Sequence, residues 1–74
     1  MTAIKKTIRK ISELFNIDIT AIKTESELLS TIDYFVDKVW FDEDIEADVI
    51  ETINGDVLCC VKNENDEIVE IYFE

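Results

Sequence analysis

The dipeptide Asn54-Gly55 limits the folds open to this chain more than any other feature, because it separates two apolar runs and contains the only glycine. Both residues tolerate the positive φ angles of a type I′ turn, which joins antiparallel strands. We therefore expect a hairpin with strands at about 48–53 and 56–62. A four-residue polar turn precedes a third apolar run at about 67–73, so this half of the chain is typical of an antiparallel β-meander.

A two-residue turn also predicts which residues oppose each other: Ile50 faces Cys59, and Val49 faces Cys60. The side of the sheet expected under the helices is then made of Val49, Ile53, Leu58, Cys60, Val69, Ile71 and Phe73. The opposite side holds Ile50, Val57, Cys59, Val61, Ile68 and Tyr72. Because this second side is too apolar for an ordinary solvated surface, we expect the N-terminal helix, a second copy or a partner to cover it.

The N-terminal half has helical periodicity. Residues 3–15 carry one apolar face, made of Ile4, Ile8, Ile11 and Phe15. Thr2 is the expected N-cap of this helix, and Asn16 is the expected C-terminal stop.

Residues 17–29 allow two interpretations. Ile17 and Ile19 alternate with polar residues as in a strand, whereas Thr24 and Glu27 form the capping-box signature of a helix start. Ser30 is a second candidate start.

With either start, we expect a second helix that runs to about Trp40, followed by an acidic connection at 42–48. The predicted fold is α+β. It has two helices packed against a three-stranded antiparallel β-meander, with a fourth, edge strand from 17–29 left open, in one domain over residues 1–74.

Charge is divided unevenly along the chain. Residues 24–74 hold 16 carboxylates against Lys38 and Lys62, or −14, whereas residues 1–23 carry +3. Such a charge bears on partners rather than on the fold. It repels DNA and anionic membranes and attracts basic proteins, of which nucleic-acid enzymes are the commonest.

With no histidine and one glycine, the chain offers neither an imidazole base nor a phosphate-binding loop. We therefore expect a binding protein, not an enzyme, with no cofactor.

The acidic connection is the first candidate contact site. In an extended segment, Asp42, Asp44, Glu46 and Asp48 would share one face and repeat every ~6.6–7 Å. This is close to the spacing of phosphates along one nucleic-acid strand, so we expect the array to occupy a basic DNA-binding groove. The alternative is a solvated surface that only serves solubility. The pattern also resembles the start of a calcium loop, but Ala47 replaces the required glycine, and no metal site is predicted.

Three short segments resemble the phage-encoded uracil-DNA glycosylase inhibitor family, whose members imitate DNA. Thr24–Leu28 is similar to the family's Gln-Glu-Ser-Ile-Leu segment, which lies on an edge strand and enters the enzyme's DNA-binding cleft. Glu46–Thr52 is similar to an acidic strand, and Val57–Val61 with Ile68–Phe73 is similar to the last hairpin.

The resemblance implies that Glu25 and Ser26 contact the enzyme, and the neighbouring Glu27 and Leu28 complete this second candidate site. Glu27 departs from the family pattern, which has an apolar residue there. Other phage DNA mimics, including anti-restriction and anti-CRISPR proteins, share the acidity without a common motif.

The predicted function is therefore that of an acidic DNA mimic, which inhibits a DNA-processing or DNA-binding enzyme, with uracil-DNA glycosylase as the narrower expectation. The alternative is a small interaction module without mimicry, such as a homodimer or an immunity or anti-CRISPR-type protein.

The chain shows no signal peptide and no membrane span, so we expect it in the cytoplasm, that of the host cell if a phage encodes it. The adjacent Cys59 and Cys60 are expected as reduced thiols.

Overall fold

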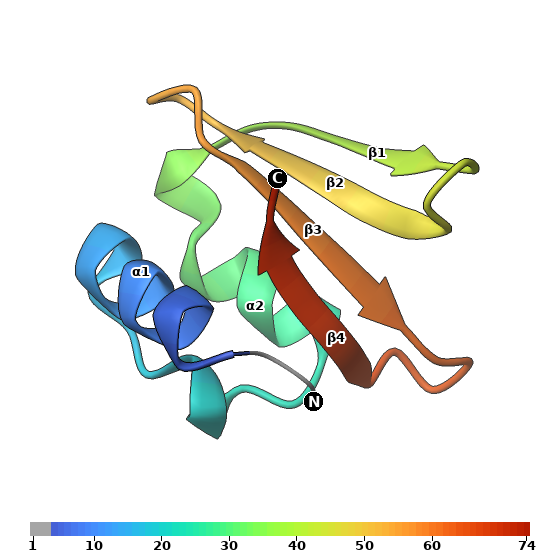
Figure 1. The fold of residues 1–74 in the computed structure, drawn as a ribbon, viewed down its shortest axis with the longest axis horizontal. Coiled ribbons are helices and arrows are strands. Elements are labelled where there is room, and N and C mark those ends of the chain that lie inside the picture. Colours follow the sequence, from blue (N-terminus) through green and yellow to red (C-terminus); the bar gives the residue numbers. More distant parts are fainter. Residues whose placement is uncertain (1–3) are drawn as a thin grey trace.

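The computed structural model describes residues 4–74, in which two α-helices pack on one four-stranded antiparallel sheet (Figure 1). The helices are α1 (Lys5–Phe15) and α2 (Glu25–Thr31), and the short 3-10 helices are η1 (Ile19–Ala21) and η2 (Asp33–Phe35). The strands are β1 (Val36–Asp42), β2 (Ala47–Thr52), β3 (Val57–Lys62) and β4 (Ile68–Phe73), adjacent in chain order. The predicted α+β class is confirmed.

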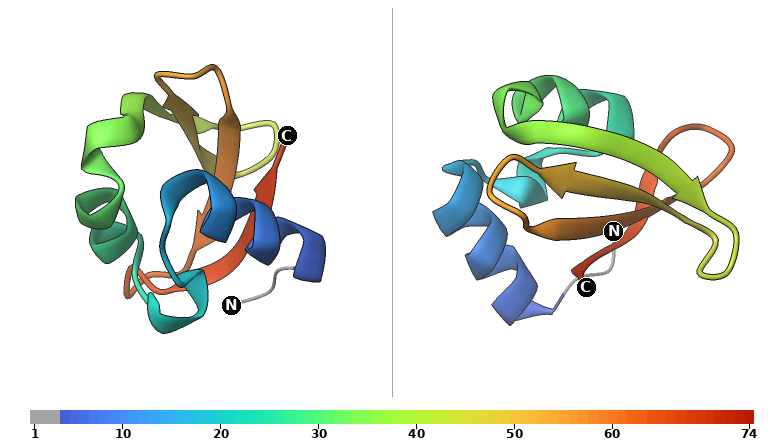
Figure 2. Two further views of the ribbon diagram at one scale, coloured as in Figure 1. Left: turned by 90° about the vertical axis from the view of Figure 1, so that its left-hand side faces the viewer. Right: turned by 90° about the horizontal axis from the view of Figure 1, so that it is seen from above.

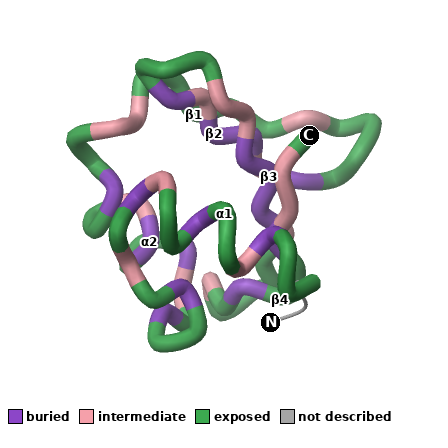
Figure 3. Tube along the Cα trace, turned by 60° about the vertical axis from the view of Figure 1, so that its left-hand side comes forward, coloured by how far each residue is buried: buried purple, intermediate pink, exposed green. Residues whose placement is uncertain are grey.

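Both helices lie on the same side of the sheet (Figure 2). The buried residues gather where the helices meet the strands (Figure 3). From the helical half, the core receives Ile11, Phe15, Ile19, Ile22, Leu28 and Ile32. From the sheet, it receives Ile50, Leu58, Cys60, Ile68 and Ile71.

The N-terminal helix is confirmed close to its predicted bounds. Asn16 adopts the left-handed conformation, with φ of 54°, and ends α1 as expected. Ile4 occupies the N-cap position without a side-chain hydrogen bond, and Thr2 lies outside the described residues.

The prediction that the second helix extends to about Trp40 is wrong. Thr24 is its N-cap, where the side-chain Oγ1 accepts a hydrogen bond from the Glu27 amide at 3.2 Å, but α2 ends at Thr31. After η2, the chain becomes β1 and pairs with β2 from Val36↔Thr52 to Asp42↔Ala47. The β-branched and aromatic residues of β1 favour a pleated strand, which also gives the sheet its fourth member.

Residues 17–29 form no strand, so the open alternative of an edge strand there is also wrong. They contain η1 and the start of α2, and only the isolated bridge Thr24↔Glu67 joins them to the sheet.

The Asn54-Gly55 hairpin is confirmed, but its loop has three residues instead of two. The Thr52 amide donates to the Asp56 carbonyl at 2.9 Å, and the Gly55 amide donates to the Thr52 carbonyl at 3.0 Å. Gly55 alone in this loop has a positive φ, of 84°, as three-residue hairpin loops require at one position.

The longer loop shifts the register by one residue, so Ile50 opposes Leu58 and Val49 opposes Cys59. Because strand side chains alternate, this slip exchanges the two faces of β2. Ile50 therefore lies in the core, and Val49 lies on the opposite face, contrary to the prediction.

The register of β4 is shifted by two residues from the prediction, with Cys60 opposite Ile71. A shift of two preserves the face, so Ile71 packs in the core as expected. A bulge next to Val61 and Lys62 places Ile68 in the core, whereas Val69 is 45% exposed; both were predicted on the other face.

The side of the sheet away from the helices carries its own small apolar cluster. We call this the open face, and it consists of Ala47, Val49, Val57, Cys59, Val61 and Tyr72. Of the three alternatives expected to cover it, α1 is wrong, because α1 packs in the main core; a second copy and a partner stay predictions. Cys59 and Cys60 are both buried and are not joined to each other by a disulfide. Among residues 4–74, no helix has the length and apolar character needed to cross a membrane.

Candidate functional site: an acidic end around Lys62

Two acidic turns lie at the same end of the sheet, because alternate connections of a meander return to the same side (Figure 1). One turn joins β1 to β2 and the other joins β3 to β4. We call residues 42–48 and 62–67 the acidic end. Its carboxylates are Asp42, Glu43, Asp44, Glu46, Asp48, Glu64, Asp66 and Glu67. Its one cation is Lys62.

Lys62 is the centre of an internal ion cluster. Its Nζ lies 2.8 Å from Oε2 of Glu25, 3.5 Å from Oδ2 of Asp48 and 3.6 Å from Oδ1 of Asp66. The Lys62 side chain is 43% exposed, whereas that of Glu25 is 3% exposed. These contacts tie the end of β3 to the first turn of α2, to β2 and to the β3–β4 turn. Among residues 4–74, every ion pair belongs to this cluster.

Asp66 fixes the start of α2 against the β3–β4 turn. Its carbonyl accepts a hydrogen bond from the Glu25 amide at 3.0 Å, and its Oδ2 accepts one from the Ser26 amide at 3.1 Å. These bonds satisfy amides that a helix N-terminus leaves without intrahelical partners. The hydrogen bonds from Ser26 and the nearby Lys62 ammonium hold the pKa of Asp66 below its ordinary value.

Glu25 has the most perturbed carboxyl group at this end. Its pKa is raised to about 7, chiefly by burial and also by the neighbouring Asp48 carboxylate, while the Lys62 ammonium acts to lower it. Its Oε1 is buried and has no hydrogen-bond partner in the described part of the chain. A protonated Glu25 could donate a hydrogen bond to the Asp48 carboxylate. This hydrogen bond favours the neutral form of Glu25 and so contributes to its raised pKa. The hydrogen bond to Glu25 in turn raises the pKa of Lys62.

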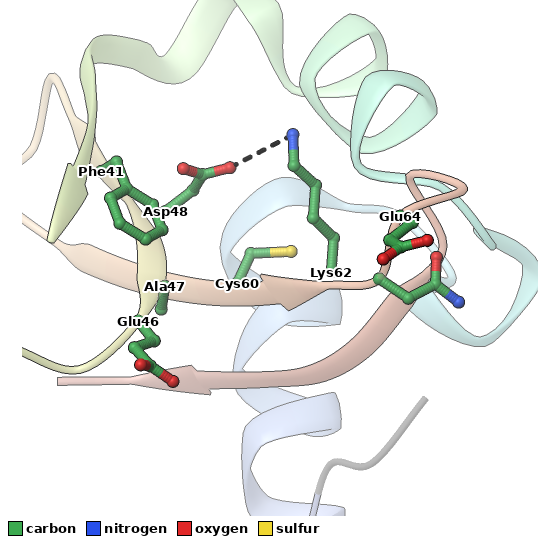
Figure 4. A pocket seen from close by; sticks show the side chains of 8 residues that line it. Phe41, Glu46, Ala47, Asp48, Cys60, Lys62 and Glu64 are labelled. Carbon is green, nitrogen blue, oxygen red and sulfur yellow. Dashed lines mark ion pairs between the residues drawn. The ribbon is translucent and has the colours of Figure 1, made fainter. Parts of the chain in front are cut away.

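A shallow pocket of about 290 Å³ lies beside the cluster (Figure 4). It is lined by Phe41, Glu46, Ala47, Asp48, Cys60, Lys62, Asn63 and Glu64. In Figure 4 the side chains of Lys62 and Asp48 point toward each other across it. Carboxylates thus surround an apolar floor, an arrangement suited to the stem and cationic head of a long basic side chain.

The structure brings the two candidate segments, 24–28 and 42–48, to the same end through the contacts of Glu25 and Asp48 with Lys62. Ser26 and Glu27 are exposed on α2. Leu28 is fully buried in the core, and Glu25 is buried in the ion cluster, so neither side chain lies on the surface. Partner binding by Ser26 and Glu27 stays a prediction.

The prediction of a linear carboxylate array at 42–48 is wrong. Asp42 ends β1, Asp44 lies in the turn, and Glu46 has a left-handed φ of 50°. The Oδ1 of Asp42 accepts a hydrogen bond from the Asp44 amide at 2.9 Å, which tightens the turn. Asp48 alone of the four is within β2, and it is directed to Lys62.

Lys62 and Asp66 were not among the predicted site residues. The signal for Lys62 was available, since it is one of two cations among the 16 carboxylates of residues 24–74. Asp66 gave no local signal, because its contacts with Ser26 span 40 positions. No group of side chains within residues 4–74 is arranged to hold a metal ion.

The segment that resembles an edge strand of the glycosylase inhibitor family, Thr24–Leu28, is the N-cap and first turn of α2 in this chain. The implied edge strand is therefore wrong here. No protein-family model, curated protein or solved structure matches the chain.

Proposed function

We propose that this protein is an acidic DNA mimic, which inhibits a DNA-binding or DNA-processing protein by occupying its basic groove. The observation that carries the proposal is the acidic end, where eight carboxylates stand against one lysine. That lysine is already paired with Glu25, Asp48 and Asp66 inside the protein.

The remaining exposed carboxylates have no cation beside them in the described chain. They are Glu43, Asp44, Glu46, Glu64 and Glu67. Two adjacent turns hold them at one end of a packed sheet, so their positions need little ordering when a partner binds. Complementary charge both steers association and selects the partner, and a basic nucleic-acid groove provides that complement.

The test begins with capture from a cell lysate on immobilised protein at low and high salt. Each captured protein is then purified, and its binding to a labelled DNA duplex is measured with and without an equimolar amount of this protein. We expect capture at low salt, release at high salt and loss of DNA binding. Partners without a basic groove, or partners that still bind DNA in the complex, would contradict the proposal.

A pair of matched variants locates the contact. The triple change Glu43→Gln, Asp44→Asn and Glu46→Gln removes three charges from the acidic end, and we expect it to weaken inhibition at least tenfold. This corresponds to roughly 1.4 kcal/mol or more. The control is Glu13→Gln, Glu70→Gln and Glu74→Gln, which removes three exposed charges elsewhere and should weaken inhibition less than threefold. Equal loss in both variants would mean that net charge acts without a defined site.

Uracil-DNA glycosylase is the narrower target that the sequence resemblance suggests. A uracil-excision assay at equimolar protein tests it directly. Unchanged excision would remove this target and leave the wider proposal to the capture experiment.

A further inference from the structure

The two edges of the sheet differ in how far other chain segments cover them. At the β4 edge, the Ile68 amide donates to the Lys23 carbonyl at 2.8 Å, and Thr24 forms a bridge with Glu67. At the other edge, β1 pairs with β2 alone, and within residues 4–74 no strand or bridge lies on its outer side (Figure 2). The outer backbone amides and carbonyls of β1 are therefore free to pair with another strand.

β1 exposes a run of apolar side chains at this edge, between the charged residues Asp37 and Lys38 on one side and Asp42 on the other. Val39, Trp40 and Phe41 are consecutive and are 44%, 42% and 59% exposed. Proteins generally blunt such edges with proline, charge or a bulge. Here the bulge lies at the start of the strand, between Val36 and Lys38, and the chain has no proline.

Charge decides which strand fits this edge. β1 carries Asp37 and Asp42 against Lys38, and the acidic turn 43–46 continues from it, so the charge along this edge is net negative. Antiparallel pairing of two copies about Val39 would place the turn of each beside Asp33 of the other, and each copy carries −11. Like charges brought together in this way disfavour association. A strand with lysine or arginine side chains meets the opposite situation, and its cations can also lie over Trp40 or Phe41.

We propose that β1 receives an extended basic segment of the partner as a fifth strand of the sheet. This inference rests on the proposed function, because the partner is the same basic protein. Main-chain hydrogen bonds would supply affinity, while Trp40 and Asp42 on one face of the strand and Phe41 on the other favour basic side chains.

The experiment uses the full, ¹⁵N-labelled chain and two synthetic peptides of alternating lysine and valine. In the second peptide, every backbone nitrogen is methylated, which keeps the charge but blocks pairing along both edges of the peptide. We expect the unmethylated peptide to shift the amide signals of β1, and to slow hydrogen exchange there at least tenfold. The methylated peptide should bind at least fivefold more weakly and leave exchange in β1 unchanged.

The chain offers a matched pair of variants for the same assay. Val39→Thr, on β1, should weaken peptide binding at least threefold. Val69→Thr makes the same change on β4 at nearly the same exposure, 45% against 44%, and should leave binding unchanged. Threonine preserves strand propensity, so the fold should persist in both variants.

Each other outcome has a definite meaning. Equal binding of both peptides, or signal shifts confined to the acidic turns, would overturn strand addition and leave the proposed function standing. Failure of both peptides to bind would overturn it as well. A peptide-free dimer with protected β1 amides, seen by sedimentation and exchange, would assign the edge to a second copy and overturn the proposal. Strand addition without capture of any DNA-binding protein would instead contradict the proposed function.

Discussion

Glu25 and Glu46 lie at the same end of the molecule, yet their carboxylates have opposite environments. Glu25 is buried against Lys62, and its pKa is raised to about 7. Glu46 is exposed in the β1–β2 turn, without an ion pair in the described chain. The comparison shows that acidity alone does not identify a binding residue. Glu25 connects α2 to the sheet, whereas Glu46 and its neighbours remain available to a partner.

Lys62 separates these two groups of carboxylates. Lys62 is the only lysine at this end, and its ammonium group pairs with Glu25, Asp48 and Asp66. The carboxylates of the turn receive no such compensation, and their mutual repulsion should lower the stability of the free protein. A basic partner would relieve that repulsion. The carboxylates of the turn should therefore lower the stability of the free protein and strengthen its binding to the partner.

The largest effect is expected for Lys62→Met, which removes the cation from the buried cluster. At pH 8 we expect the free energy of unfolding to fall by about 3 kcal/mol, the low end of the range for a buried charge that loses its partner, because Lys62 is partly exposed and Glu25 can take up a proton, while Asp48 and Asp66 lose their cation as well. The loss should be smaller at pH 5, where Glu25 holds a proton. Urea unfolding at the two pH values measures both quantities.

The matched control for that experiment is Lys38→Met. Lys38 is exposed on β1 and has no ion pair in the described chain, so its loss should cost less than about 0.5 kcal/mol. Equal costs for the two lysines would mean that the Lys62 cluster does not stabilise the fold.

The next effect is a pH dependence that arises from Glu25. Its pKa in the folded protein, about 7, lies above the ordinary value of 4.5, so the folded state retains the proton longer than the unfolded chain. The stabilisation from this residue is complete below pH 4.5 and is lost as the pH rises through about 7. The loss amounts to about 3 kcal/mol for a shift of this size.

Glu25→Gln should remove that pH dependence, because the amide keeps a similar shape without a charge. The difference in unfolding free energy between the variant and the wild type is measured from pH 4.5 to 8. It should change by about 3 kcal/mol in favour of the variant. Glu27→Gln, two positions along on the exposed side of α2, is the control for removal of a carboxylate from this helix. A constant difference for Glu25→Gln would show that this carboxyl titrates normally.

Local patterns in the sequence predicted the elements whose contacts are local. The apolar repeat of α1, the stop at Asn16 and the hairpin at Gly55 were all recovered. β1 was misread because the spacing from Ile32 through Val36 to Val39 also fits a helix. Pairing with β2 decided the outcome, and that pairing is a tertiary interaction.

The acidic end was only half predictable for the same reason. Charge counting found the carboxylates of 42–48, but it could not separate exposed from buried ones. The contact between Glu25 and Lys62 joins positions 37 residues apart, and no periodicity encodes it. The one-residue slip of β2 came from a hairpin loop one residue longer than its dipeptide signal suggested.

The smallest expected effect concerns the exposed carboxylates of the β1–β2 turn. Glu43→Gln, Asp44→Asn and Glu46→Gln together should stabilise the free protein by about 0.5 kcal/mol at low salt, because they reduce self-repulsion. The gain should vanish near 1 M salt, where the Debye length is about 3 Å. By contrast, Glu13→Gln on α1 lies one turn from Arg9 and Lys10, and it should be neutral or slightly destabilising. Thermal unfolding across a salt series measures both variants. A gain in stability from the same triple change that weakens inhibition would mean that the turn is held acidic for its partner and at the expense of the fold.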